Sequence, residues 1–391
     1  MNETADKGGR LMSIDALRGA DMLFIMGFAS VVVALCQLLG FGRECWLATQ
    51  MTHVSWHGFR HHDTIFPLFL FLAGASWPYS YASQVAKGRT VGAILRKMAF
   101  RVVALIFLGV ASSSFFAFKF DNLRYDSVLA HIALCWAAAA LLYMFVKSFK
   151  VRLVIAVALL VAHWLLLMFV SAPDAAALLS STDPVVAKKV AAYAAYGTDG
   201  FSFTGNLAGW IDRTFMPGNL YETIFDPDGL LGKVTGTVTA MLGVFAGELL
   251  RSKSLSGGRK TALLVGAGVL SLVICLAWQP WCPVNKKIWT STFILAAGAY
   301  SFLVLALFYW IVDVKGWRRW TFFFRVIGMN SITIYVMMRF VDFRAMSKFF
   351  FTGLAGLGNA HWNVMIICLG QVLIEWLVLL YMYRKNTFLK V

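Results

Sequence analysis

Apolar stretches of about 20 residues recur along the whole chain, and this repetition constrains the fold more than any other feature. A helix of that length crosses the ~30 Å hydrocarbon core of a bilayer. Hydrophobic residues make up 60% of the chain and charged residues only 14%, which excludes a water-soluble globular fold. The stretches are continuous rather than alternating, so they predict helices and not the strands of a membrane barrel.

We predict ten membrane-spanning helices, and a short helix at 184–196 would raise the number to eleven. In chain order the expected spans are 17–41, 64–84, 99–118, 127–146, 151–172, 230–250, 261–278, 290–312, 322–341 and 364–383. The predicted fold class is therefore all-α: a polytopic membrane protein with one transmembrane domain over residues 1–391. Charged residues interrupt the start of the first span, so we expect a retained signal anchor and not a cleaved signal peptide.

The basic residues are distributed unevenly across these spans. Of the 35 Lys and Arg residues, 22 lie on the side of the N-terminus and 13 on the other side, which predicts cytoplasmic termini and an inner-membrane location. Six acidic residues lie inside and twelve outside, so the net charge of +16 lies on the cytoplasmic face. Anionic lipid explains such an excess, and a phosphate-rich cytoplasmic ligand is the alternative. We expect no nucleic-acid partner.

One connection, residues 173–229, is much longer than the others and is predicted to lie outside the membrane. Loops longer than about 15 residues in a compact chain are usually functional or disordered. This one contains Trp210, Phe215, Tyr221 and Phe225 among Asp and Arg residues, which favours an ordered, lid-like structure.

Four histidines, His53, His57, His61 and His62, lie within ten residues on the outer connection between the first two spans, directly before Asp63. Histidine can accept and donate a proton near neutral pH, and a carboxylate partner fixes its tautomer. As the first acidic residue of a helix, Asp63 is also suited to capping it. The i, i+4 spacing of three histidines on a helix could bind zinc, but no HExxH pattern supports this and we predict no metal. Exposed histidines without a chemical role are the plain alternative.

Charged residues at the start of the first span and in the middle of the last span are further candidates. Asp15, Arg18 and Asp21 have i, i+3 and i+6 spacing at the cytoplasmic edge, which suits internal ion pairing or binding of a cytoplasmic ligand. Glu375 follows Gln371 by one helical turn in the middle of the last span. Carboxylates within the membrane usually line a cavity or have a partner, so Glu375 is a candidate site residue.

Several sequence blocks occur in the order found in one known family. They are SIDALRG (13–19), HVSWHG (53–58), DTIFP (63–67), LFLAG (70–74), AGWIDR (208–213), DPDGLLG (226–232), GVFAG (243–247) and GMNSITIY (328–335). Together they resemble the heparan-alpha-glucosaminide N-acetyltransferase family and its bacterial predicted-acyltransferase relatives, over most of the chain.

The resemblance implies a transmembrane enzyme that moves an acetyl group from cytosolic acetyl-CoA to a glucosamine-type amino sugar on the outer face. Transfer to a sugar hydroxyl is a second option. The active-site histidine of the family corresponds to His53, with Asp63 as its neighbour, near the extracytoplasmic side. His53 would act either as a general base or as the acceptor of the acetyl group in a covalent intermediate. Both mechanisms stay open.

Further site residues are predicted from the residues within these blocks and from their spacing. The residues expected to bind the acceptor are Trp56, His57, Asp212, Arg213, Asp226, Asp228 and Asn330. Those expected to bind acetyl-CoA are Asp15, Arg18 and Asp21. Trp56, Asn330 and backbone amides are also candidate donors to the oxyanion of the transition state. Lysosomal members carry an asparagine near the outer end of the first span, where this chain has Phe28, Ala29 and Ser30, so that residue's role does not carry over.

The expected partners are acetyl-CoA, an amino sugar or glycan acceptor and the lipid bilayer, with a homodimer as an open question. Two other classes of function compete with the enzyme. A sugar or proton-coupled solute transporter would use Glu375 and the outer histidines as proton sites. A scaffold without turnover is the third class.

Overall fold

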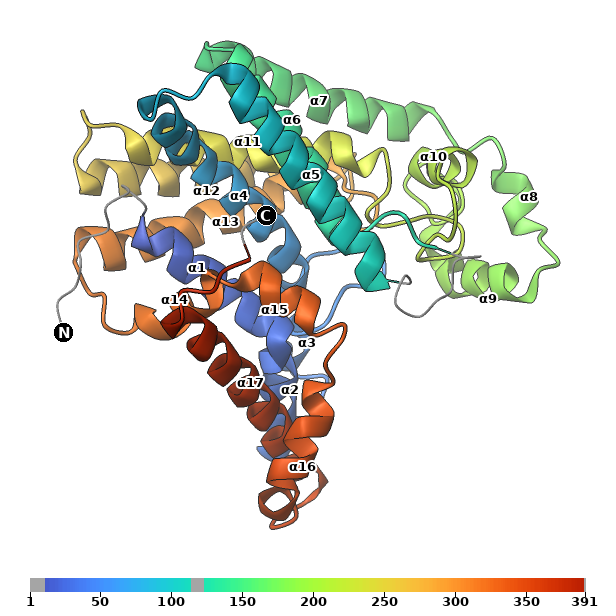
Figure 1. Cartoon of the computed structure of the whole chain (residues 1–391). Helices are drawn as coiled ribbons and strands as arrows, with labels where there is room; N and C mark the ends of the chain where they lie inside the picture. Colours follow the sequence, from blue (N-terminus) through green and yellow to red (C-terminus); the bar gives the residue numbers. More distant parts are fainter. Residues whose placement is uncertain (1–10, 114–122, 390–391) are drawn as a thin grey trace.

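The structure is a computed structural model that describes residues 11–113 and 123–389 (Figure 1). Those residues form helices joined by turns and two isolated β-bridges, with no strand of a sheet among them. The prediction of an all-helical, polytopic membrane protein is confirmed, because several helices are long and apolar enough to cross a bilayer.

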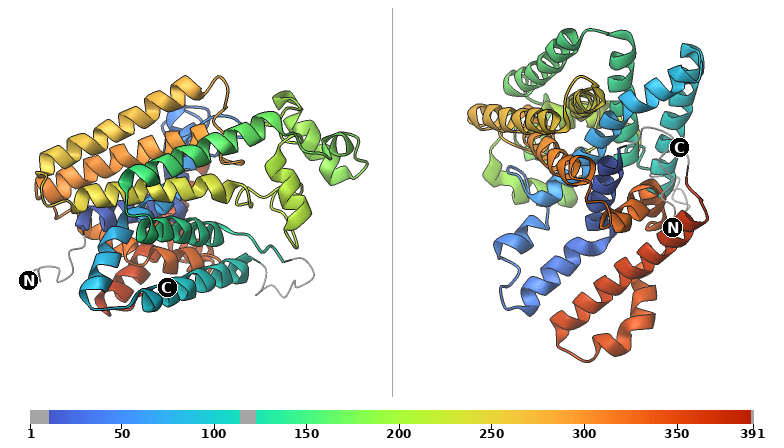
Figure 2. Two further views of the ribbon diagram at one scale, coloured as in Figure 1. Left: turned by 90° about the horizontal axis from the view of Figure 1, so that it is seen from above. Right: turned by 90° about the vertical axis from the view of Figure 1, so that its left-hand side faces the viewer.

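Seven helical segments in the described part of the chain meet this requirement of length and apolar composition. They are Met12–Leu38 (α1, η1 and α2), Val128–Phe145 (α6), Phe149–Phe169 (α7), Gly232–Arg251 (α11), Gly257–Trp278 (α12), Ser291–Val314 (α13 and η5) and Ala360–Arg384 (α17). Figure 2 shows α11, α12 and α13 side by side.

Three predicted spans are not among these seven. Helices α4 (His61–Ala86) and α5 (Val91–Ser113) are long, but α4 contains many polar and small residues, and α5 carries Arg96, Lys97 and Arg101. The predicted span 322–341 is not one continuous helix. It consists of α14 (Thr321–Gly328) and α15 (Ser331–Met337), with a break at Met329 and Asn330.

Helices α4 and α11 pack against each other through glycines at very short backbone distances. A Cβ atom added to Gly74 of α4 would lie 2.1 Å from the carbonyl oxygen of Ala240, and one added to Gly243 of α11 would lie 1.9 Å from that of Phe71. No side chain larger than hydrogen fits at either position. Small residues allow such close approach of helices within a membrane, where van der Waals packing holds helices together.

Helices α1 (Met12–Leu23) and α14 make a second contact of the same kind. A Cβ atom on Gly19 would lie 1.8 Å from the carbonyl oxygen of Phe324, and one on Gly328 would lie 2.0 Å from that of Asp15. The first span then changes direction at Gly27, whose φ of 111° lies within η1 (Phe24–Phe28). Beyond this bend, α2 (Ala29–Leu38) runs alongside α17, and both project from the bundle with α16 (Phe343–Ala355) (Figure 1).

The long connection 173–229 folds into short helices at one end of the bundle, on the right in Figure 1. These are α8 (Ala175–Leu179), α9 (Pro184–Tyr193), η4 (Ala194–Tyr196) and α10 (Leu207–Phe215). The short helix predicted at 184–196 is therefore present, and it is too short to span a membrane. Phe201, Phe203 and Phe225 are buried here against Trp56, so the segment packs on the connection that carries the histidines.

We expect Gly243→Ala to destabilise the protein, because the added methyl group collides with the α4 backbone. Overpacking of this kind costs roughly 1–3 kcal/mol. Gly266→Ala is the matched control: Gly266 lies on α12 with open space around its Cα. Thermal unfolding in detergent micelles measures both. Equal melting temperatures for the two variants would contradict the role of close α4–α11 packing.

Candidate functional site

The connection that carries the first two histidines is irregular. After the short helix α3 (Trp46–Gln50), residues 51–60 form no helix, and α4 begins only at His61. Gly58 has a φ of 129°, a conformation that favours glycine, and its N–H donates to the carbonyl oxygen of Val284. The i, i+4 alignment of His53, His57 and His61 on one helix face is therefore not formed.

His53 is instead paired with Asp63. Its Nδ1 lies 2.7 Å from Oδ1 of Asp63, whose side chain is only 2% exposed, whereas the His53 side chain is 55% exposed. The other carboxylate oxygen of Asp63 accepts hydrogen bonds from the backbone N–H groups of Arg60 (3.2 Å) and Val54 (3.4 Å). Asp63 thus caps α4 and orients the histidine at the same time. With the Nδ1 hydrogen donated to Asp63, Nε2 of neutral His53 keeps a lone pair.

Lys286 lies beside this pair. Its Nζ is 3.2 Å from Nδ1 of His53 and 3.5 Å from Oδ1 of Asp63. Nδ1 cannot both donate to the carboxylate and accept from the ammonium, and the shorter contact belongs to Asp63. Lys286 therefore acts on His53 as a nearby charge. Burial lowers the pKa of Lys286, and Asp63 opposes this effect.

The other three histidines of this connection have different neighbours. The ring of His62 lies 4.5 Å from that of His53, whereas His61 packs edge-on against Phe24. Nδ1 of His57 lies 3.3 Å from the side-chain amide of Asn285, and burial lowers the His57 pKa. His53 and His62 therefore form the histidine part of the site, with His57 at its side.

Sequence reasoning missed the loop at 279–290, between α12 and α13. It brings Asn285 to His57, Lys286 to the His53–Asp63 pair, and Lys287 to Glu222 at 2.7 Å. Glu222 belongs to the connection 173–229, which we call the outer segment after the side on which the sequence predicts it. One sequence signal was available: Lys286 and Lys287 are adjacent on the face that the topology prediction places outside, where the charges almost balance.

Trp56 has a structural role. It is 1% exposed, and its indole N–H donates to the carbonyl oxygen of Phe201 at 2.9 Å. The expectation that this N–H serves a reacting oxyanion is therefore not supported, because the hydrogen is already used. Nearby, the hydroxyl groups of Ser55 and Tyr196 are 2.8 Å apart. Both contacts hold the outer segment on the histidine-bearing connection.

The carboxylates of Asp212, Asp226 and Asp228 are buried within the outer segment. Asp212 accepts hydrogen bonds from the backbone N–H groups of Asp226 (3.1 Å) and Leu230 (2.9 Å). Arg124 binds Asp226 at 2.5 and 2.7 Å and Asp228 at 2.8 Å. Burial raises the pKa of Asp212 to about 7 and that of Asp228 to about 6. These bonds give all three residues a structural role in fixing the turn formed by residues 226–229 (DPDG).

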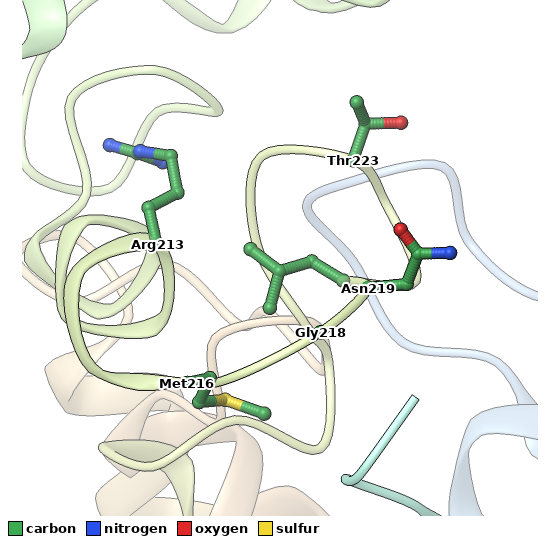
Figure 3. Close-up of a pocket in the computed structure, with 6 residues that line it drawn as sticks. Arg213, Met216, Gly218, Asn219 and Thr223 are labelled. Carbon is green, nitrogen blue, oxygen red and sulfur yellow. The ribbon is translucent and has the colours of Figure 1, made fainter. Parts of the chain in front are cut away.

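Arg213 borders a pocket of about 400 Å³ in the same segment (Figure 3). Its guanidinium group binds Asp174 at 2.6 and 2.9 Å and donates to the carbonyl oxygen of Ile224. Asn219 and Thr223 line the pocket from the loop that follows α10. Thr223 lies shortly before the turn that contains Asp226 and Asp228. Its neighbour Glu222 accepts a hydrogen bond from Lys287, so this pocket lies close to the loop 279–290.

A larger cavity, of about 930 Å³, runs along α4. Its α4 lining extends from Phe66, one turn after His62, to Gln84, roughly 27 Å apart at ~1.5 Å per residue. Asp15 and Arg18 line it as well, and they pair with each other at 3.2 Å. Arg18 also donates to Ser76. Asp21 is buried but is not among the described residues that line the cavity. Asn330, at the break between α14 and α15, lines it too.

The cavity combines an apolar wall with buried polar groups. Among the described residues, four basic side chains line it: Arg18, Lys87, Lys97 and Arg101. Arg101 lies over the Trp136 ring at 4.6 Å. Within the described residues, Nε of Arg101, the indole N–H of Trp77 and the amide nitrogen of Asn330 have no hydrogen-bond partner. Buried donors without partners are costly, so this cavity suits a ligand with acceptor groups and negative charge.

Glu375, the candidate within the last span, is fully buried and accepts a hydrogen bond from Gln371 at 3.0 Å. Gln371 also lies against the backbone at the Gly27 bend, donating to the carbonyl oxygen of Met26. The cysteines at 36, 45, 135, 275, 282 and 368 are free thiols, so Cys45 and Cys282 do not pair. No group of three or more His, Cys, Asp or Glu side chains is arranged to hold a metal in the described parts of the chain.

Together these features define a helical membrane protein with a His–Asp pair at the N-terminal end of α4 and a basic, elongated cavity along the same helix. Heparan-alpha-glucosaminide N-acetyltransferase from Homo sapiens is 28% identical to this chain over 362 residues, which cover 84% of the chain and 52% of the human protein. The Mus musculus protein of the same name is 27% identical over 370 residues, covering 84% and 53%.

These matches confirm the family relationship predicted from the motifs: the chain is a relative of the heparan-alpha-glucosaminide N-acetyltransferases. The chain spans about half the length of the curated relatives it matches. No family model matches it.

We expect Glu222→Gln to loosen the outer segment. Glu222 binds Lys189 of α9 at 2.9 Å and Lys287 at 2.7 Å. Burial raises its pKa, but the two lysines outweigh this effect and hold the pKa below its usual value of 4.5. The stabilisation is therefore complete above about pH 4.5 and is lost as the pH falls further.

Limited proteolysis at pH 7 measures this effect. A loss of about 1 kcal/mol should speed cleavage within 173–229 roughly fivefold, if cleavage follows local opening. Glu44→Gln, which removes an exposed carboxylate from the first outer connection, is the control. Unchanged cleavage of the Glu222→Gln protein would show that these ion pairs do not hold the segment.

Proposed function

We propose that the protein is an acetyl-CoA-dependent acetyltransferase of the inner membrane, with an amino sugar as acceptor on the outer face. The observation that carries the proposal is the arrangement on α4. The His53–Asp63 pair lies at the N-terminal end of this helix, and the basic cavity follows its length towards Lys87. The two relatives named above, which are N-acetyltransferases, support the same reaction class.

Acetyl-CoA would bind in the cavity along α4. Arg18, Lys97 and Arg101 supply positive charge for its phosphate groups, and Asn330 and Trp77 supply buried N–H donors. The apolar wall, including Phe66 and Phe69, suits the less polar arm that carries the thioester. Phe66 lies one helical turn from His62, whose ring contacts that of His53. The thioester would therefore approach the histidine along α4.

His53 would act on the acceptor through Nε2. A protonated amine is not a nucleophile, so the amine first loses one proton to solvent. Nε2 of His53 then takes a second proton from the nitrogen as the C–N bond to the thioester carbon forms. The C–S bond then breaks, and the proton passes from Nε2 to the leaving thiolate. Asp63 holds the ring in the required tautomer throughout. Transfer through an acetylated His53 uses the same geometry, and single-turnover kinetics separates the two routes.

The outer segment would hold the acceptor. It packs over the histidine-bearing connection through Trp56 and Tyr196, and it contains the pocket bordered by Arg213. A neutral or basic sugar amine must reach His53 from this side, since the cavity along α4 would hold the donor.

We expect His53→Ala to lower the rate of acetyl transfer by a factor of about 10²–10⁴, because it removes the general base. The fold should be unaffected, because the His53 side chain is largely exposed. Purified protein is incubated with radiolabelled acetyl-CoA and glucosamine, and label on the sugar is counted. His361→Ala removes an exposed histidine at the start of α17 and should retain activity. Full activity of His53→Ala would remove His53 from the mechanism. Solute uptake into liposomes without acetyl-CoA would favour a transporter instead.

We expect Arg101→Gln to weaken acetyl-CoA binding about tenfold or more, because a charged hydrogen-bond donor contributes roughly 1.5–3 kcal/mol. Arg96→Gln is the matched control: Arg96 lies on the same helix and is exposed, but it does not line the cavity. Equilibrium binding of labelled acetyl-CoA to the detergent-purified variants measures both. Equal affinities would place the donor site elsewhere.

A further inference from the structure

Lys286 lies against the His53–Asp63 pair but comes from a loop distant in sequence. Its Nζ is 3.2 Å from Nδ1 of His53 and 3.5 Å from Oδ1 of Asp63. The loop is held rigidly: the neighbouring Asn285 is fully buried and its side-chain oxygen accepts the backbone N–H of Lys287. Lys286 is therefore presented to the pair by the fold.

A carboxylate next to a histidine favours the imidazolium form, in which both ring nitrogens carry hydrogen. In that form Nε2 cannot accept a proton. A cation at 3.2 Å has the opposite effect, because it disfavours a second positive charge on the ring. The same cation compensates the negative charge of the buried Asp63, so the carboxylate can stay ionised and orient the ring.

We propose that Lys286 is a positioning residue of this site: its ammonium group balances the charge of Asp63 and keeps His53 in the neutral form that accepts a proton at Nε2. The catalytic consequence rests on the proposed acetyl transfer, whereas the charge balance does not. After His53 takes the proton of the attacking amine, Lys286 also favours its release to the leaving thiolate.

The charged and titratable groups around His53 come from three elements. Asp63 and His62 belong to α4, and Lys286 belongs to the loop before α13. Arg60, which precedes α4, donates to the backbone carbonyl oxygen of His53 at 3.1 Å, so its cation lies at the backbone of that residue. Among the described residues, Lys286 is the cation whose charged atom contacts the His53 ring.

The test is an NMR titration of histidine rings in detergent micelles, with the His53 signal assigned by its loss in His53→Gln. We expect Lys286→Gln to raise the pKa of His53 by about 1 or more, and Lys286→Arg, which keeps the charge, to leave it close to the original value. Lys188→Gln removes a positive charge from an exposed position on α9 and should cause no shift. Lys286→Met, of similar length, replaces Lys286→Gln if that variant does not fold.

The pH profile of acetyl transfer gives the second readout. In Lys286→Gln the acidic limb should move to higher pH by the same amount, so that the rate falls about tenfold at low pH and little at high pH. An unchanged His53 pKa overturns the inference, and so does an equal loss of rate at every pH, which indicates only a structural role. If the original protein transfers no acetyl group, the proposed function fails, and the NMR titration still decides whether Lys286 sets the charge of His53.

Discussion

The close contact between α4 and α11 is the interaction on which the rest of the structure depends. Gly74 and Gly243 allow the two backbones to approach until no Cβ atom fits between them. In a bilayer the lipid is as apolar as the helix surface, so close packing replaces the hydrophobic effect as the force that fixes a helix. α4 carries the candidate site at one end and the cavity along its length, and its fixed position therefore sets the relation between the two.

The buried charges fall into two groups with different physical roles. In the outer segment, backbone N–H groups and Arg124 donate hydrogen bonds to the carboxylates of Asp212, Asp226 and Asp228. These bonds offset the free-energy cost of burying the three carboxylates. In the cavity along α4, Arg101 and Asn330 keep donor atoms without a partner in the described structure. A group that is buried and satisfied stabilises the fold, whereas one that is buried and unsatisfied is suited to bind a ligand.

The apolar runs predict the helical fold well, since length and hydropathy are local properties of the sequence. Breaks within a run are less predictable: the chain bends at Gly27 and is interrupted at Asn330, and neither break changes the apolar character of the run. For the site, Asp63 follows four histidines closely enough in sequence to suggest a His–Asp pair, and the family resemblance pointed to His53 as the histidine; the structure pairs these two residues, which are ten positions apart. Lys286 comes from 233 positions further along the chain, and no local pattern reveals such a contact. Likewise, the sequence predicts acceptor binding for Asp226 and Asp228, and no local pattern reveals that Arg124, about 100 positions away, binds both carboxylates.

An acetyltransferase that works across a membrane must bring a thioester to the acceptor without opening a continuous water path. An aromatic cluster lies where the cavity along α4 approaches the end of the helix that carries the His53–Asp63 pair. Phe66, which lines the cavity, packs edge-on against His131 and Trp289, and the rings of His131 and Trp289 stack at 4.4 Å. The Trp289 indole N–H is tied to the carbonyl oxygen of Pro227 in the outer segment. The wall of the cavity and the DPDG turn are therefore physically connected, so a movement of Phe66 to admit the thioester would act on the segment proposed to hold the acceptor.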